Sequence, residues 1–128
     1  MIRDYLNFIR RDWMKLSGKY NVDGLIAKED ERYQVIDNTT LNNLILSSTS
    51  LNPGHSTSGH AHKGQEEVYL FIKGAGDMTL TYPNGDKNSF DVSDGDIVLV
   101  EDGVHHKVVN SGDKVLYFIC VFDGKRSH

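Results

Sequence analysis

The chain has 128 residues, a length that suits one domain, because two domains would each be too short to bury a stable core. Its formal net charge is −4 with acidic and basic residues interleaved, so no basic surface for a nucleic-acid backbone is expected. A small anionic metabolite is still compatible with this charge, because a few backbone amides and hydroxyls suffice to bind one. We therefore expect a small-molecule partner, and neither nucleic acid nor a membrane.

Two further features concern the cellular compartment. The single cysteine, Cys120, lies in the apolar run 115–122, which excludes an intramolecular disulfide and predicts a buried thiol in a reducing compartment. The first residues contain no apolar signal segment, and no run is apolar for long enough to span a bilayer. These features predict a cytoplasmic protein.

An amphipathic helix is predicted at the start of the chain, over residues 2–16. Its apolar residues recur every three or four positions, which places them on one helix face: Ile2, Leu6, Ile9, Trp13 and Leu16. Gly18 follows as a stop signal. We expect this segment, residues 1–18, to lie on the outside of the barrel or against a neighbouring subunit, and exposed Ile9 and Trp13 would favour a homodimer.

From residue 19 to residue 128 the pattern changes to short β segments. Stretches rich in Val, Ile, Tyr, Phe and Thr are separated by turns of Gly, Asn, Asp and Ser. This rhythm predicts an all-β fold with one barrel or sandwich. The expected strands are 24–28, 32–37, 42–51, 58–62, 67–73, 77–82, 88–92, 96–100, 105–110 and 115–122.

Histidine and glutamate residues stand in a metal-ligand pattern on these strands. His60 and His62 are two residues apart, so in a strand both side chains point to one face. Glu67 opens the next buried strand, where a carboxylate needs a cationic partner. His106 follows a later turn, and alternation places it on the opposite face from His105. We therefore predict one divalent transition metal (Fe, Mn, Ni, Co or Zn) held by three imidazoles and a carboxylate.

Two points about this site stay open at the level of the sequence. Glu66 is the alternative carboxylate ligand, although strand alternation turns it away from the face of Glu67. Four protein ligands leave two positions of an octahedral ion open, where a bidentate substrate, or a substrate and oxygen, would bind.

The spacing of these residues resembles the two sequence motifs of the cupin superfamily. The first motif is matched by Gly54, His60, His62, Glu67 and Gly74, and the second by Gly95, Gly103, His106 and Asn110, with Glu101 where the family usually has proline. The resemblance runs from Leu51 to Phe122 and implies a single double-stranded β-helix, or jelly-roll, barrel. It also implies that the metal ligands are His60, His62, Glu67 and His106.

A closer resemblance is to the cupin-type glucose-6-phosphate isomerases of archaea. It rests on segments 57–62, 67–69, 73–78, 83–86 and 109–113. In that family a Thr-x-Gly-His segment places a hydroxyl and a backbone amide near the sugar phosphate, which implies that Thr57 and Gly59 bind substrate here. His55 is a further candidate for substrate contact. The loop between Gly54 and Thr57 is shorter than in those isomerases.

The resemblance implies an aldose–ketose isomerase acting on a sugar phosphate. The metal would polarise the carbonyl, and Glu67 or Tyr69 would move the proton between the two carbons, with a hydride shift as the alternative route. Two other functions remain open, because one fold hosts many chemistries. They are an iron-dependent dioxygenase or lyase acting on a small metabolite, and a non-enzymatic sugar or metabolite binder.

Overall fold

The structure is a computed structural model of the chain and describes residues 14–61 and 64–124. Most of the helix expected over 2–16 therefore lies outside the described residues, and so does His62. The part of the expected helix that the structure does describe, Met14 to Leu16, forms a bend and an irregular segment instead of a helix. No helix that could cross a membrane occurs in the part of the chain that is described.

Every regular element in the described residues is a β-strand. The strands are β1 (Leu25–Glu29), β2 (Tyr33–Asn38), β3 (Leu44–Leu51), β4 (Glu67–Lys73), β5 (Ala75–Thr81), β6 (Lys87–Ser93), β7 (Ile97–Val100), β8 (His105–Val109) and β9 (Leu116–Asp123). Each overlaps one of the expected ranges, and β4 agrees with its prediction at both ends. The alternation of apolar and polar residues thus located the strands, because it follows from the local two-residue period of extended backbone.

The strand expected over 58–62 is the exception: the described part of this range, 58–61, forms no strand, so this prediction was wrong there. His60 forms only an isolated bridge with His106, and the neighbouring Gly59 has a φ of 76°, which interrupts an extended strand. The segment therefore runs along β8 as a loop that is attached at a few points.

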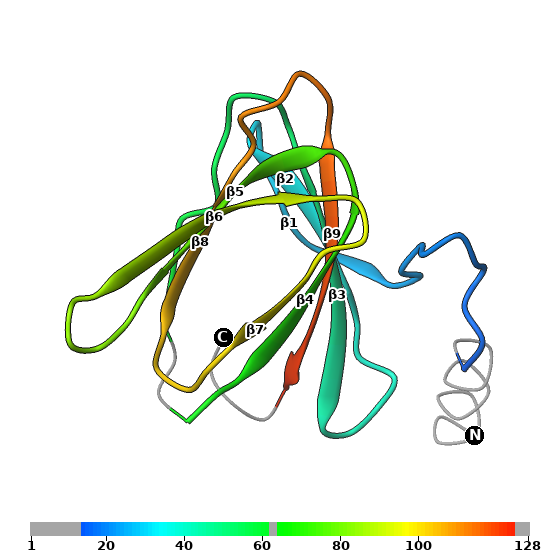
Figure 1. The fold of residues 1–128 in the computed structure, drawn as a ribbon. Coiled ribbons are helices and arrows are strands. Elements are labelled where there is room, and N and C mark those ends of the chain that lie inside the picture. Colours follow the sequence, from blue (N-terminus) through cyan, green and yellow to red (C-terminus); the bar gives the residue numbers. More distant parts are fainter. Residues whose placement is uncertain (1–13, 62–63, 125–128) are drawn as a thin grey trace, which may run out of the picture.

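The strands form two antiparallel sheets that face each other (Figure 1). The larger sheet has the order β1-β2-β3-β9-β4-β7, and the smaller has the order β6-β5-β8. Strands that are distant in sequence, such as β3 and β9, lie side by side, as in a jelly-roll barrel. The predicted all-β, double-stranded β-helix fold is confirmed.

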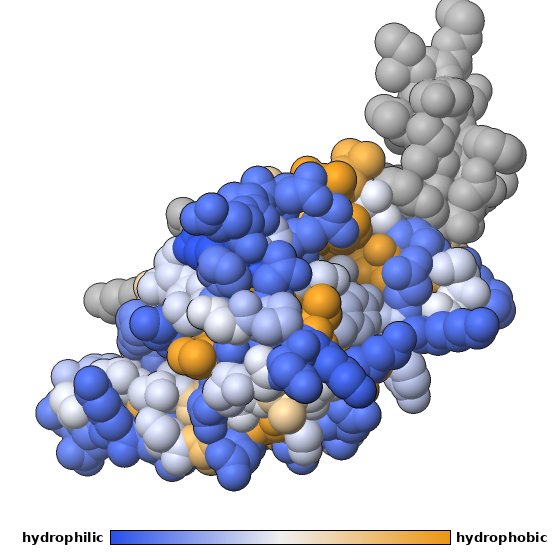
Figure 2. Space-filling model, turned by 90° about the horizontal axis from the view of Figure 1, so that it is seen from above, coloured by the Kyte–Doolittle hydropathy of each residue, from blue (hydrophilic) through white to orange (hydrophobic). Residues whose placement is uncertain are grey.

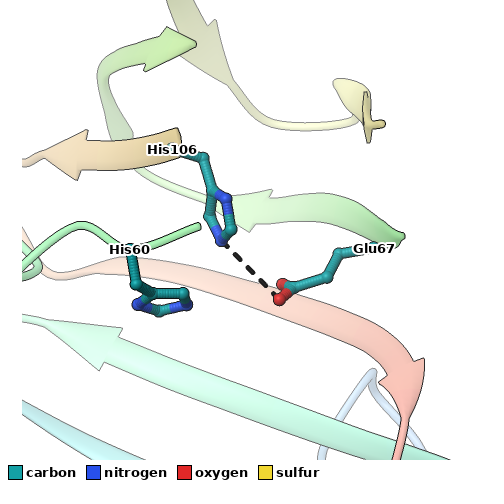
Figure 3. Close-up of side chains that lie close together, drawn as sticks. All are labelled: His60, Glu67 and His106. Atoms are coloured by element: carbon teal, nitrogen blue, oxygen red, sulfur yellow. Dashed lines mark ion pairs between the residues drawn. The ribbon is translucent and has the colours of Figure 1, made fainter. Parts of the chain in front are cut away.

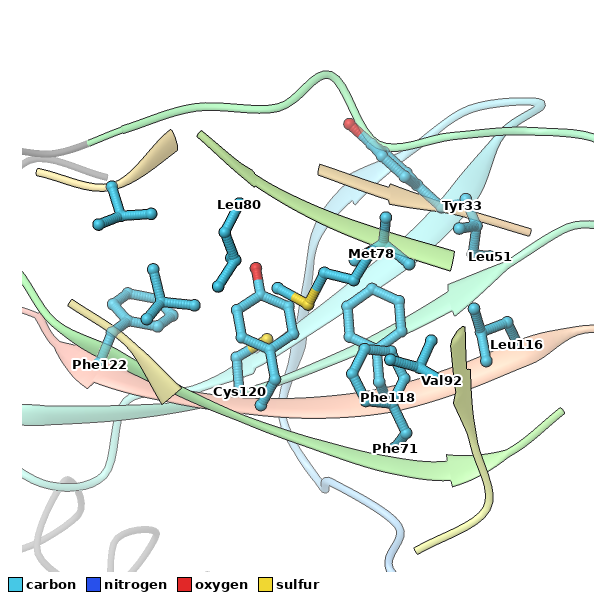
Figure 4. Close-up of a cluster of buried hydrophobic side chains, with 14 residues drawn as sticks. Tyr33, Leu51, Phe71, Met78, Leu80, Val92, Leu116, Phe118, Cys120 and Phe122 are labelled. Carbon is cyan, nitrogen blue, oxygen red and sulfur yellow. The ribbon is translucent and has the colours of Figure 1, made fainter. Parts of the chain in front are cut away.

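The hydrophobic core fills the space between the two sheets (Figure 4). Phe71 and Phe118 are almost fully buried and lie with ring centroids 5.3 Å apart. Tyr69 stacks on Phe118 at 5.6 Å, which joins this aromatic centre to the end of β4 where Glu67 lies. Packing of these rings holds β4 and β9 rigidly together, so the residues at the start of β4 are well positioned.

Gly74 shows why the motif demands a glycine between β4 and β5. Its φ is 95°, and a Cβ at this position would approach the Val115 carbonyl oxygen to 2.6 Å. Any larger residue would push the turn away from the start of β9. The glycine thus serves the fold and not the chemistry of the site.

Candidate metal centre

Three of the predicted metal ligands converge inside the barrel (Figure 3). Glu67 is the first residue of β4, His106 lies on β8, and His60 lies on the loop before β4. Two backbone hydrogen bonds join the histidines: His60 N donates to the His106 carbonyl at 3.3 Å, and His106 N donates to the His60 carbonyl at 3.0 Å. This bridge fixes the two rings next to each other, with centroids 4.6 Å apart and an angle of 77° between their planes.

The distances among the three side chains suit a shared ion. One potential ligand atom from each of His60, Glu67 and His106 lies within 4.8 Å of the other two. The distance from His106 Nε2 to Glu67 Oε1 is 3.6 Å. His62, the fourth predicted ligand, lies outside the described residues, so its role stays a prediction. The described donors are imidazole nitrogens and a carboxylate oxygen, a set that could hold a divalent transition metal.

The orientation of His106 also suits a ligand. Its Nδ1 lies 3.1 Å from the Val104 carbonyl oxygen, which favours the tautomer with the proton on Nδ1. The lone pair is then on Nε2, the atom that faces Glu67. A backbone carbonyl that orients a histidine in this way is the usual support for a metal-bound imidazole.

Glu67 lies in an environment that disfavours an isolated charge. Its side chain is buried, and burial raises its pKa to about 7, while a hydrogen bond from Tyr69 acts in the opposite direction. Its Oε1 atom is buried and accepts no hydrogen bond from the residues that the structure describes. A cation at this point would stabilise the carboxylate, so the site fits the predicted metal. Glu66 is exposed, as the alternation of β4 predicts.

A cavity of about 110 Å³ adjoins these donors. His60, Glu67 and Tyr69 line one part of its wall. Burial raises the pKa of Tyr69 well above its usual value, so the phenol keeps its proton at neutral pH. The cavity therefore combines a metal-ligand set with a neutral hydroxyl.

Thr57 is the predicted substrate residue that the structure places at this cavity. Its backbone N donates to the Val108 carbonyl at 2.9 Å, and its Oγ1 accepts a hydrogen bond from Val108 N at 3.0 Å. These bonds attach the loop to β8 and leave the hydroxyl proton of Thr57 available for a ligand. A structural role and a binding role are thus compatible at this residue.

Gly59 and His55, the other predicted substrate residues, are not among the described residues that line the cavity. A Cβ on Gly59 would lie 2.7 Å from the His105 ring, which explains the glycine by packing. The His55 carbonyl accepts a hydrogen bond from Asn110 N at 2.9 Å. Their contact with substrate stays a prediction.

Residues of the second sequence motif also have structural roles. Asn110 is fully buried, and its Nδ2 donates to the Leu51 and Lys114 carbonyls, each at 2.8 Å. The Glu101 carbonyl accepts a hydrogen bond from Val104 N at 3.1 Å, so this turn forms with glutamate where the motif usually has proline. The turn before His106 is therefore intact.

Several further residues with polar or charged side chains line the cavity that the sequence alone did not indicate as site residues, among them Lys28, Asp37, Ser47, Thr49 and Cys120. Burial raises the pKa of Cys120 well above its usual value, and the predicted buried thiol is confirmed. Ser47 and Thr49 share one face of β3 with Ile45 and Leu51, since these four residues are spaced by two, and this spacing was a signal in the sequence that polar groups face the core. Their neighbours come from other strands, which the sequence does not reveal.

Comparison with known proteins supports this description of the site. Residues 48–122 match the family model named Cupin domain. The glucose-6-phosphate isomerases of Pyrococcus furiosus and Pyrococcus abyssi are 32% and 31% identical over 116 residues, which covers 81% of this chain and 61% of each isomerase. The chain thus spans less than two thirds of the length of these relatives.

Solved structures give the same fold. Oxalate decarboxylase from Bacillus subtilis superposes with a TM-score of 0.68 and 26% identity, covering 73% of this chain and 26% of the decarboxylase. That decarboxylase has Mn(II) centres. Because the family model matches more than half of the sequence, and the barrel and its histidine–glutamate cluster agree with it, the chain belongs to the cupin family.

Proposed function

We propose that this cupin is a metal-dependent isomerase that interconverts an aldose phosphate and a ketose phosphate, with glucose 6-phosphate as the first substrate to test. The observation that carries the proposal is the convergence of His60, Glu67 and His106 beside a cavity whose lining includes polar side chains. The two Pyrococcus relatives, which are named glucose-6-phosphate isomerases, support the choice of reaction.

The metal would be held by His60, Glu67 and His106, with His62 as the fourth ligand predicted from the sequence. Fe, Mn, Ni, Co and Zn all suit these donors, and the Mn(II) centres of the decarboxylase make Mn the first ion to test. When bound, the metal would polarise the substrate carbonyl and stabilise negative charge on the adjacent oxygen.

Glu67 and Tyr69 would have different roles in the reaction. Tyr69 keeps its proton because burial raises its pKa, so it would donate a hydrogen bond and not accept a proton. Proton transfer between the two carbons would then belong to the Glu67 carboxylate. A hydride shift is the alternative, because it requires no base at this position.

A direct assay tests the proposal. The protein is loaded in turn with Mn, Fe, Co, Ni and Zn, mixed with glucose 6-phosphate, and fructose 6-phosphate is followed by NMR. We expect conversion with at least one ion and none with His106→Ala. Absence of conversion by a folded, metal-loaded protein would contradict the isomerase assignment.

A metal-dependent lyase is the second candidate, and the 26% identity to an oxalate decarboxylase favours it. Its test is formation of formate and carbon dioxide from oxalate by the Mn-loaded protein. Ligand-dependent thermal stabilisation without any product would instead indicate a binding protein.

A further inference from the structure

A row of polar side chains crosses the inner face of the larger sheet. Strand register pairs Asp37 of β2 with Ser47 of β3, Ser47 with Cys120 of β9, and Cys120 with Tyr69 of β4. All four residues line the cavity beside the metal ligands. We call these four residues the polar row.

The polar row is flanked on the same face by positions that are mainly hydrophobic. On one side, Phe118 of β9 pairs with Phe71 of β4 and with Thr49 of β3, and on the other side Phe122 of β9 pairs with Ile45 of β3 and with Glu67 of β4. Interiors of this kind retain polar groups where those groups find hydrogen-bond partners, because an unpaired polar group in the core is costly. Asp37 and Ser47 hydrogen-bond to each other, and the lone pairs that remain on the carboxylate can accept hydrogen bonds from a ligand in the cavity.

The chemistry of the row indicates which groups the ligand carries. Ser47 Oγ donates a hydrogen bond to Asp37 Oδ1 at 2.6 Å, so the serine proton is already used. An ionised carboxylate only accepts hydrogen bonds, and the serine oxygen also retains an accepting lone pair. The Asp37 end of the row thus offers acceptors to the donors of a ligand, and Lys28 is a cationic residue in the lining of the same cavity.

We propose that Asp37 and Ser47 bind hydroxyl groups of a polyhydroxylated substrate whose reacting end lies at His60, Glu67 and His106. This inference rests on the proposed function and deepens it, because it names residues that select a sugar chain over a short carboxylic acid. Hydroxyls donate to the Asp37 carboxylate, whereas a dicarboxylate at the same place meets a like charge.

Binding measurements on Asp37→Asn test the inference. The Mn-loaded protein is titrated by calorimetry with glucose 6-phosphate and, separately, with oxalate, which has no hydroxyl groups. We expect the variant to bind glucose 6-phosphate at least about tenfold more weakly, the size expected for loss of a hydrogen bond to a charged group. Its oxalate affinity should be equal or higher, because a negative charge has been removed.

The matched control is Asp91→Asn, which removes the same charge from an exposed position on β6 and should change neither affinity. Ser47→Ala keeps the carboxylate and provides a second variant in case Asp37→Asn does not fold. It should weaken glucose 6-phosphate binding by about threefold, as expected for one neutral hydrogen bond.

The outcomes separate this inference from the proposed function. Weaker sugar-phosphate binding by Asp37→Asn without turnover by the wild type would support the polar row and overturn the isomerase. Turnover by the wild type with unchanged binding by both variants would overturn the polar row. A wild-type protein that binds oxalate but not glucose 6-phosphate would overturn both.

Discussion

The two faces of the larger sheet differ in an instructive way. The inner face carries the polar row and Glu67 among buried aromatic rings. The outer face of edge strand β7 carries apolar side chains in solvent, with Ile97 64% and Leu99 68% exposed. Figure 2 shows one side of the surface, where hydrophobic side chains form separate patches among hydrophilic ones.

This contrast shows which deviations from a simple inside-outside pattern carry functional information. Exposed apolar residues are common on folded proteins and by themselves indicate nothing specific. Buried polar residues are less common, and Ser47, Thr49 and Glu67 are buried polar residues that line one cavity. Substitutions on the inner face should therefore affect function and stability strongly, and substitutions on the outer face should affect them weakly.

The largest effect is expected at the metal ligands. His106→Ala and Glu67→Gln each remove a donor, so we expect bound metal to fall below stoichiometric amounts and isomerase activity to fall by about a thousandfold or more. Elemental analysis after dialysis measures the metal. Glu66→Gln, at the exposed position just before β4, is the control and should retain both. Full metal content in the Glu67 variant would remove Glu67 from the ligand set.

The aromatic centre should dominate stability. Phe71→Ala would leave a cavity between Phe118 and Tyr69 and should lower the free energy of unfolding by about 3–5 kcal/mol. Urea denaturation followed by circular dichroism measures the change. A loss below about 1 kcal/mol would mean that the barrel does not depend on this packing.

Tyr69→Phe separates packing from chemistry, because the ring remains and only the hydroxyl is lost. We expect kcat to decrease by about tenfold to a hundredfold, because the donor next to Glu67 is missing. Metal content and unfolding free energy should change little. An unchanged kcat would exclude a role for the hydroxyl in the reaction.

Gly59 tests whether the loop beside the metal centre requires glycine for packing. Gly59→Ala should lower the unfolding free energy by about 2 kcal/mol, because it combines a positive φ with a clash against His105. The control is Gly85→Ala, where φ is 93° and nothing lies within 4 Å of the added Cβ. Adding His105→Ala to the Gly59 variant should remove the difference between them, and a persistent difference would exclude the clash.

The smallest effect is expected on the outer face. Leu99→Lys places a charge at an exposed position and should change the unfolding free energy by less than about 0.5 kcal/mol. A large loss of stability in the Leu99 variant would contradict the description of this face as solvent-exposed.

The homodimer expected from the sequence stays a prediction. Light scattering on the wild-type protein and on the Leu99 variant tests it.

Much of the fold was predictable because its signals are local. The alternation that places Glu67 and His106 inside, and Glu66 outside, depends only on neighbouring residues. The motif spacing likewise indicated three ligands that the structure brings together. The loop in place of the strand expected over 58–62 was not predictable in this way, because the residue pattern does not reveal the positive φ of Gly59 or the single bridge to β8.

The sequence by itself determined the all-β class, the approximate strands, the cupin motifs and the candidate ligands, since each follows from a short-range period or a fixed spacing. Only the tertiary structure decided which polar residues meet at the cavity. Asp37, Ser47 and Cys120 lie on three different strands and become neighbours through strand register. That register depends on the closure of the whole barrel, because each strand is positioned by the side chains of strands distant in the chain.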